Sequence, residues 1–85
     1  MTLRIDRYSE GGRTTIRLIG RTQAEHMSEV QNQIEESEGD VTLDLEEVTL
    51  VDVQVVRFLG SCMARGINVV NGSPYITDWI ARERA

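Results

Sequence analysis

The segment from residue 41 to 71 constrains the fold most, because its strand and helix patterns follow one another in the order of a β-α-β crossover. Apolar residues alternate with polar ones over residues 41–45, and an acidic turn then leads to Asp52. A helix that Gly66 closes comes next, followed by a short apolar strand over residues 67–70. Since the two strands of a crossover are parallel, we expect Asp52 to lie just past the carboxyl end of a strand, where α/β folds carry functional residues.

The segment before this crossover contains the signals of a hairpin and a helix. Two stretches with alternating apolar residues are joined through Gly11-Gly12, which is the turn chemistry of a tight β-hairpin. Thr22 and Glu25 match a capping box, and we expect them to begin a first helix. A polar linker with a break at Gly39 follows that helix. The apolar stripe of the helix is narrow, which predicts a largely exposed helix, and consists of Met27, Val30 and Ile34.

Start and stop signals define the other two helices. Asp52 is a good N-cap residue for the second helix, and Gly66 is well placed as the residue that follows its last turn. Ser73 followed by Pro74 repeats such a start signal for a third helix. The order is therefore β-β-α-β-α-β-α, and we predict one α/β domain over residues 1–85 with a four-stranded mixed sheet.

The second helix is predicted to have two different faces. Its broad packing side consists of Val55, Val56, Phe58, Leu59, Cys62 and Met63. Its solvent-facing stripe, with spacings of three and four residues, consists of Gln54, Arg57, Ser61 and Arg65. Gly60 lies inside this helix, where glycine costs roughly 1 kcal/mol relative to alanine. The missing side chain either lets a neighbouring element approach closely or is simply tolerated.

Charge is distributed unevenly along the chain. The net charge is −5, but residues 1–21 carry +3, residues 22–52 carry −10 and residues 53–85 carry +2. The acidic middle argues against nucleic acid as the main partner, because phosphate contacts need a concentrated basic surface. It fits a basic protein partner or an arginine-bearing second copy of the chain, or it serves solubility alone.

The reactive residue types do not form a catalytic pattern in the sequence. His26 is the one histidine and is expected to be exposed beside the stripe of the first helix, while Cys62 lies on the packing side of the second. A dyad needs hydrogen-bond reach between its members, and a metal site needs more ligands of these types. We therefore expect no enzymatic activity, no metal and no cofactor. Neither a signal peptide nor a long apolar run is recognised, so a cytoplasmic protein without membrane insertion is expected.

Two runs in the crossover, Val-Thr-Leu-Asp-Leu at residues 41–45 and Val-Thr-Leu-Val-Asp at residues 48–52, resemble the signature of STAS domains. The likeness continues through the second helix to Gly66, the apolar strand and Ser73-Pro74. This family includes the bacterial anti-sigma-factor antagonists and the cytoplasmic tails of sulfate transporters. In the antagonists, the aspartate that matches Asp52 precedes a serine or threonine that an anti-sigma kinase phosphorylates. The dephosphorylated antagonist binds the kinase and releases the sigma factor.

The chain departs from that family pattern at several places. Val53 stands where the antagonists carry the phosphorylated hydroxyl group, so we expect no phosphorylation at the usual position, and Val55 stands where a glycine is usual. The chain also stops after the third helix, whereas family members continue with a further strand and helix. Residues 67–70 are therefore expected to form an open apolar edge that invites pairing with a second copy. The resemblance further implies that Asp44 supports the loop before the second helix.

These features predict a non-enzymatic protein-interaction module in signalling or transcription regulation. The expected partner is a protein like an anti-sigma kinase, or a transport ATPase of which this chain is an accessory subunit, and a homodimer is a further hypothesis. The predicted partner-binding surface consists of Asp52, Val53, Gln54, Val55 and Arg57. A STAS-like domain that senses a nucleotide or another anion at the start of the second helix is the alternative, although Glu46, Glu47 and Asp52 weigh against an anion there.

Overall fold

The computed structural model of the protein describes residues 3–37 and 39–84. In this part of the chain, four strands form one sheet, and three α-helices and a short 3-10 helix accompany them. In chain order the elements are β1 (Leu3–Glu10), β2 (Arg13–Thr22), η1 (Ala24–His26), α1 (Met27–Glu36), β3 (Asp40–Val51), α2 (Val53–Ala64), β4 (Asn68–Val70) and α3 (Pro74–Arg84). The predicted α/β class and the predicted order of strands and α-helices are confirmed.

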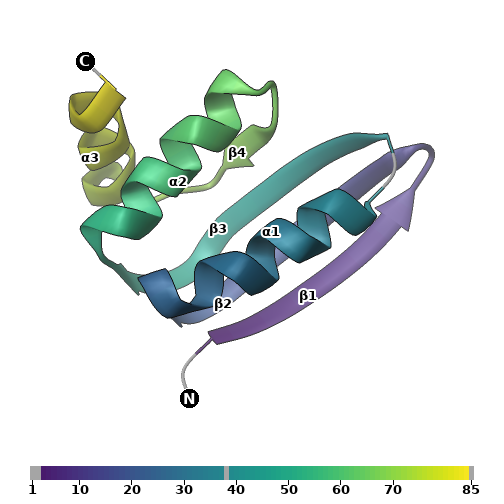
Figure 1. Ribbon diagram of the computed structural model, residues 1–85, viewed down its shortest axis with the longest axis horizontal. Helices are drawn as coiled ribbons and strands as arrows, with labels where there is room; N and C mark the ends of the chain where they lie inside the picture. Colours follow the sequence, from purple (N-terminus) through teal and green to yellow (C-terminus); the bar gives the residue numbers. More distant parts are fainter. Residues whose placement is uncertain (1–2, 38, 85) are drawn as a thin grey trace.

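The sheet is mixed, and its strands lie in the order β1-β2-β3-β4 (Figure 1). β1 and β2 pair antiparallel, whereas β2 with β3 and β3 with β4 pair in parallel. β3, α2 and β4 therefore form the predicted crossover. The strand after α2 is short, since β4 pairs with β3 through Asn68, Val69 and Val70.

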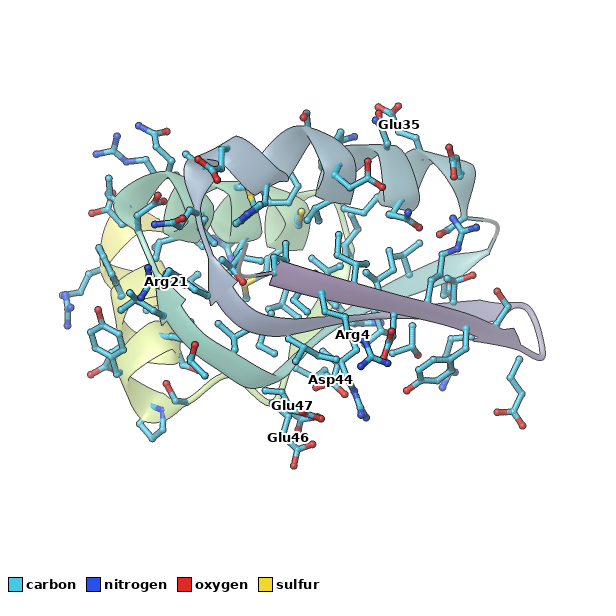
Figure 2. All side chains as sticks on the ribbon, turned by 90° about the horizontal axis from the view of Figure 1, so that it is seen from below. Arg4, Arg21, Glu35, Asp44, Glu46 and Glu47 are labelled. Atoms are coloured by element: carbon cyan, nitrogen blue, oxygen red, sulfur yellow. The ribbon has the colours of Figure 1, made fainter. Side chains whose placement is uncertain are left out.

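The fold has two layers, because α1 and α2 cover one face of the sheet (Figure 1, Figure 2). Successive side chains of a strand point to opposite faces. In β2 this alternation buries Ile16 and Leu18 under the helices and leaves Arg17 half-buried on the other face. The buried core consists of Ile16, Leu18, Val30, Ile34, Leu43, Leu45, Val51, Val55, Val56, Leu59, Cys62, Ile76 and Ile80.

The hairpin turn is held against the start of β3. Gly11 and Gly12 have φ values of +59° and +77°, as the predicted tight turn requires. The backbone N–H of Asp40 donates to the carbonyl oxygen of Gly12 at 3.2 Å. Gly39 has a φ of +74°, and a Cβ there would collide with the same carbonyl oxygen. The predicted break at Gly39 is therefore a position where any side chain would be strained.

The predicted acidic turn after residue 45 was wrong, because β3 continues through both glutamates to Val51. The pairing with β2 shifts between Arg17–Asp44 and Ile19–Glu47, so β3 carries an extra residue there. A second shift follows between Gly20 and Arg21. Such bulges bend a strand without ending it, and the charged glutamates remain exposed on the strand.

The predicted capping box of Thr22 and Glu25 was also wrong. Thr22 is the buried last residue of β2, and the N-cap of η1 is Gln23. The Gln23 backbone N–H donates to Nδ1 of His26 at 3.0 Å, and the His26 N–H donates back to the Gln23 carbonyl at 2.9 Å. This contact draws the imidazole toward the backbone. The His26 side chain is therefore only 18% exposed, and the prediction of an exposed histidine was wrong.

The predicted ends of the other helices are confirmed. Asp52 caps α2, and Gly66 follows that helix with a φ of +88°. Pro74 begins α3, where the Ile76 N–H donates to Oγ of Ser73 at 3.3 Å.

α3 packs closely on α2 at Gly60. This glycine is buried, and a Cβ built there would lie 3.1 Å from Cγ of Arg84. The close approach of a neighbouring helix, one of the two interpretations of Gly60, is thus observed. Met63, predicted on the packing side of α2, is 38% exposed.

Candidate functional site

The carboxylate of Asp52 joins the starts of two helices. Its Oδ1 accepts the backbone N–H of Val55 in the first turn of α2 at 2.9 Å. Its Oδ2 accepts the backbone N–H of Ala24, the first residue of η1, also at 2.9 Å. The hydrogen bond from Val55, with the one from Ala24, holds the pKa of Asp52 below its usual value. Asp52 therefore fixes the position of η1 relative to α2.

An open hollow of about 510 Å³ lies between these two elements. We call it the α1–α2 hollow, and its lining residues are Ala24, Met27, Gln54, Arg57, Phe58 and Ser61. Met27 and Phe58 are half-buried and pack against the core, so they supply an apolar floor. Gln54, Arg57 and Ser61 are exposed and supply a polar wall. This combination of an apolar floor and a polar rim is typical of protein-interaction surfaces.

The structure divides the predicted partner-binding residues into accessible and inaccessible ones. Gln54 and Arg57 are exposed, and Asp52 and Val53 are half-buried at the start of α2. Val55 is fully buried in the core and has no surface with which to contact a partner. The helical period explains the difference, because Val55 lies one turn before Leu59 on the packing side of α2.

The hollow also contains residues that the sequence did not connect with Asp52. Ala24 and Met27 come from η1 and α1, and Phe58 and Ser61 come from the second and third turns of α2. Met27 belonged to the apolar stripe of the first helix, Phe58 to the packing side of the second and Ser61 to its solvent-facing stripe, whereas Ala24 had no sequence signal. Nothing in the sequence indicated that the two stripes meet, because one helix comes before β3 in the chain and the other comes after it.

The exposed stripe of α2 carries positive charge. α2 contains no acidic residue, and Arg57 and Arg65 lie on its predicted solvent-facing stripe. Nε of Arg57 donates to Oε1 of Glu83 in α3 at 3.0 Å, and the Arg57 side chain stays 60% exposed. Arg65 donates to Oε1 of Gln31 in α1 at 3.3 Å. Both arginines thus connect α2 to a neighbouring helix while remaining at the surface.

Asp44 lies on the face of the sheet that the helices leave open (Figure 2). Its Oδ1 accepts the Glu46 backbone N–H at 3.0 Å and the Asn71 side-chain amide at 3.1 Å, and its Oδ2 lies 3.5 Å from Arg17. Burial opposes ionisation of Asp44, but these donors outweigh it and keep its pKa below the usual value. Asp44 therefore supports the bulge in β3 and the residue after β4, and not a loop before α2 as the resemblance implied.

The start of α2 already carries a negatively charged group. Asp52 already places a carboxylate there, and its two oxygens take the backbone N–H groups of Val55 and Ala24. After β4, the side-chain amide of Asn71 donates to Oδ1 of Asp44 on the open face of the sheet.

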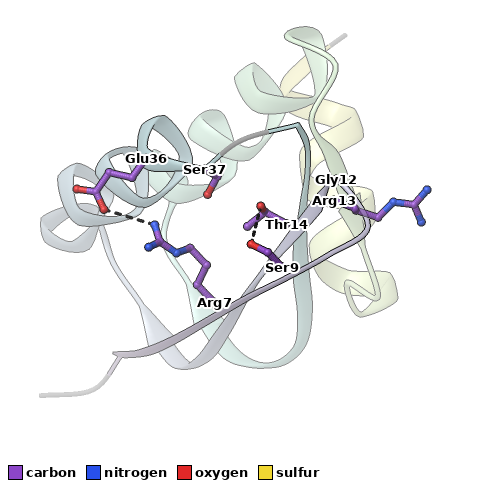
Figure 3. Close-up of a pocket in the computed structure, with 7 residues that line it drawn as sticks. All are labelled: Arg7, Ser9, Gly12, Arg13, Thr14, Glu36 and Ser37. Carbon is purple, nitrogen blue, oxygen red and sulfur yellow. Dashed lines mark hydrogen bonds and ion pairs between the residues drawn. The ribbon is translucent and has the colours of Figure 1, made fainter.

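A second hollow lies at the opposite end of α1 (Figure 3). Arg7 faces Glu36 there, with 3.4 Å between Nη1 and Oε1, and the hydroxyls of Ser9 and Thr14 lie 3.1 Å apart. Figure 3 shows the side chain of Arg13 pointing away from the other residues. The polar groups of this hollow thus interact with one another, and its two arginines do not converge on a common ligand.

The surroundings of Cys62 and of the possible metal ligands do not favour chemical reactivity. Cys62 is fully buried, and burial raises the pKa of its thiol, which disfavours the nucleophilic thiolate. In residues 3–37 and 39–84, the His, Cys, Asp and Glu side chains form no group that could hold a metal ion. None of the helices described has the length and apolar character that crossing a bilayer requires.

No protein-family model matches the chain, and a comparison with curated proteins finds no match. The likeness to STAS domains therefore rests on the residue pattern described above.

Proposed function

We propose that the protein is a non-enzymatic interaction module that binds a partner protein at the α1–α2 hollow and the exposed stripe of α2. The observation that carries this proposal is the joint at Asp52, which holds η1 and α2 together by two hydrogen bonds of 2.9 Å. Both walls of the hollow are thereby fixed before a partner arrives, which lowers the ordering cost of binding.

The binding surface has no phosphorylation switch at the position that carries it in the anti-sigma-factor antagonists. Val53 is the first residue of α2 and is half-buried beside Asp52. A phosphate at this position would add a dianion to a helix N-terminus and change the docking surface electrostatically. Since valine has no hydroxyl group, binding is constitutive with respect to this position.

The resemblance to anti-sigma-factor antagonists and the β-β-α-β-α-β-α order support a STAS-like module in the cytoplasm. The two partner classes that follow from the resemblance are a protein like an anti-sigma kinase and a transport ATPase. The sensing of a nucleotide or another anion at the start of α2 is less well supported, because Asp52 occupies that position with a negative charge.

A pull-down with a matched pair of variants tests the proposal. Ser61 is exposed in the hollow, so Ser61→Arg fills it without disturbing the core. Asn32 is exposed on α1 and does not line the hollow, so Asn32→Arg adds the same side chain elsewhere. The wild type and Asn32→Arg should retain one specific cytoplasmic protein. Ser61→Arg should bind this protein at least about tenfold more weakly, which corresponds to about 1.4 kcal/mol of binding free energy. Equal capture by all three proteins would contradict the proposal. Identification of the captured protein by mass spectrometry distinguishes a kinase from an ATPase.

A further inference from the structure

We propose that the partner segment that binds α2 is an acidic amphipathic helix, which inserts an apolar side chain into the α1–α2 hollow and places carboxylates against the arginines beside it. This inference rests on the proposed function and adds the chemistry of the partner. It follows from the shape of the surface around α2 and from the sign of its charge.

Hollows lie on both sides of the exposed stripe of α2. The α1–α2 hollow flanks it on one side. A different hollow, of about 380 Å³, lies on the other side between α2 and α3. Arg57 and Ser61 line both hollows, so they form the ridge between them. Side chains spaced three or four residues apart on a partner helix can enter hollows on either side of such a ridge.

The charge around this ridge is opposite in sign to that of the whole protein. The net charge is −5, yet the lining of the two hollows contains Arg57 and Arg84 against one acid, Glu83. Glu83 is already paired with Arg57. Arg65 extends the positive stripe beyond the end of α2. Carboxylates on a partner are therefore complementary to this surface.

The geometry of Arg57 leaves room for a second carboxylate. Its ion pair with Glu83 uses Nε, and its side chain is 60% exposed. The guanidinium presents further N–H donors at its outer end, in the planar arrangement that binds a carboxylate through two parallel hydrogen bonds.

The acidic residues of the protein lie mainly on other surfaces. Glu29 and Glu35 accept hydrogen bonds from glutamines along α1, at 2.9 Å in both cases. Asp44 and Glu47 pair with Arg17 on the open face of the sheet. A basic partner would be attracted to those surfaces, whereas the α1–α2 hollow has no acid in its lining.

A nuclear magnetic resonance titration with designed peptides tests this inference. The probe is an amphipathic helical peptide of about 15 residues, long enough to form a helix, with leucine on one face and glutamate on the other. Its matched control has lysine in place of every glutamate. The acidic peptide should shift the backbone amide signals of α2 and of residues 24–27, and should bind at least about tenfold more tightly than the lysine peptide at low salt.

Charge-reversal variants complete the test. Arg57→Glu should weaken the acidic peptide at least about tenfold, and Arg65→Glu should weaken it in the same direction. Arg4 is exposed on the open face of the sheet, and Arg4→Glu changes the net charge equally, so it should leave the affinity within about twofold. Equal or tighter binding of the lysine peptide, or shifts confined to other elements, would overturn the inference. In that case a loss of the natural partner in Ser61→Arg would still support the binding surface itself.

Discussion

Replacing Asp52 by alanine should remove two backbone hydrogen bonds at once. The first is the N-cap bond from Val55, and the loss of such a cap costs about 1 kcal/mol. The second is the bond from Ala24, and its loss costs about 1 kcal/mol more, because Ala24 is exposed and water can replace the acceptor. We therefore expect Asp52→Ala to lower the free energy of unfolding by about 2 kcal/mol.

Further substitutions separate the two hydrogen bonds. Asp52→Ser keeps an N-cap acceptor for Val55 but has no second oxygen for Ala24, so it should cost about 1 kcal/mol. Ala24→Pro removes only the N–H donor, and proline is tolerated at the first position of a helix. Gln23 has φ −129° and ψ 166°, an extended conformation that a following proline accepts. In the Ala24→Pro background, the difference between Asp52→Ser and the wild type should therefore disappear.

Urea unfolding followed by the fluorescence of Trp79 measures these differences. In thermal unfolding of the same variants, a loss of about 2 kcal/mol should lower the midpoint by about 8–16 °C in a domain of this size. Asp78→Ala removes an exposed carboxylate from α3 and serves as the matched control, with an expected change within about 0.5 kcal/mol. If Asp52→Ser were as stable as the wild type, the bond to Ala24 would contribute nothing and the joint between η1 and α2 would be refuted.

Four other outcomes follow from the structure. Gly60→Ala should raise stability by up to about 1 kcal/mol in urea unfolding, because the exposed Arg84 side chain can move away from the new Cβ; a loss of stability would show that it cannot. Gly39→Ala should cost about 2 kcal/mol or more in the same assay, since its Cβ meets the Gly12 carbonyl at a positive φ, and a neutral result would contradict the tight contact. The lowered pKa values of Asp52 and Asp44 mean that their stabilisation is present above the usual aspartate pKa of about 3.9 and is lost as the pH falls through the lower folded value; unfolding of Asp52→Asn should depend less on pH below 4 than that of the wild type. A homodimer that pairs at the β4 edge should show twice the monomer mass in light scattering at high micromolar concentration, and a monomer mass there would exclude it.

The sequence determined the local geometry where one or two residues decide it. Gly11-Gly12 fixed the hairpin turn, Asp52 and Gly66 fixed the ends of α2, and Ser73 with Pro74 fixed the start of α3. Each of these signals acts through hydrogen bonds or backbone angles within about four residues of the chain. They can therefore be read without knowing what packs nearby, and together they specify the order of the elements.

Local signals were misleading where a distant contact changed their meaning. Glu46 and Glu47 were interpreted as a turn, but pairing with β2 holds them in a bulged strand. Thr22 and Glu25 match a capping box, yet Thr22 is buried at the end of β2 and His26 makes the cap contact. In both cases the tertiary pairing outweighs a weak local preference.

The charge pattern of the sequence acquired a different meaning in the folded protein. The acidic middle segment suggested an external basic partner, but Arg7 reaches Glu36, and Arg17 reaches Asp44 and Glu47. Ion pairs between arginines of the hairpin and acids of the segment that follows it thus neutralise part of the uneven charge along the chain.

What the tertiary structure decided is the surface that can bind. The second oxygen of Asp52 reaches Ala24, 28 positions earlier in the chain, and Met27 of α1 and Phe58 of α2 line the same hollow. A cap within one turn depends on neighbouring residues and is written in the sequence. A hollow depends on the distance and angle between two helices, and only the packing of both helices on one sheet sets these.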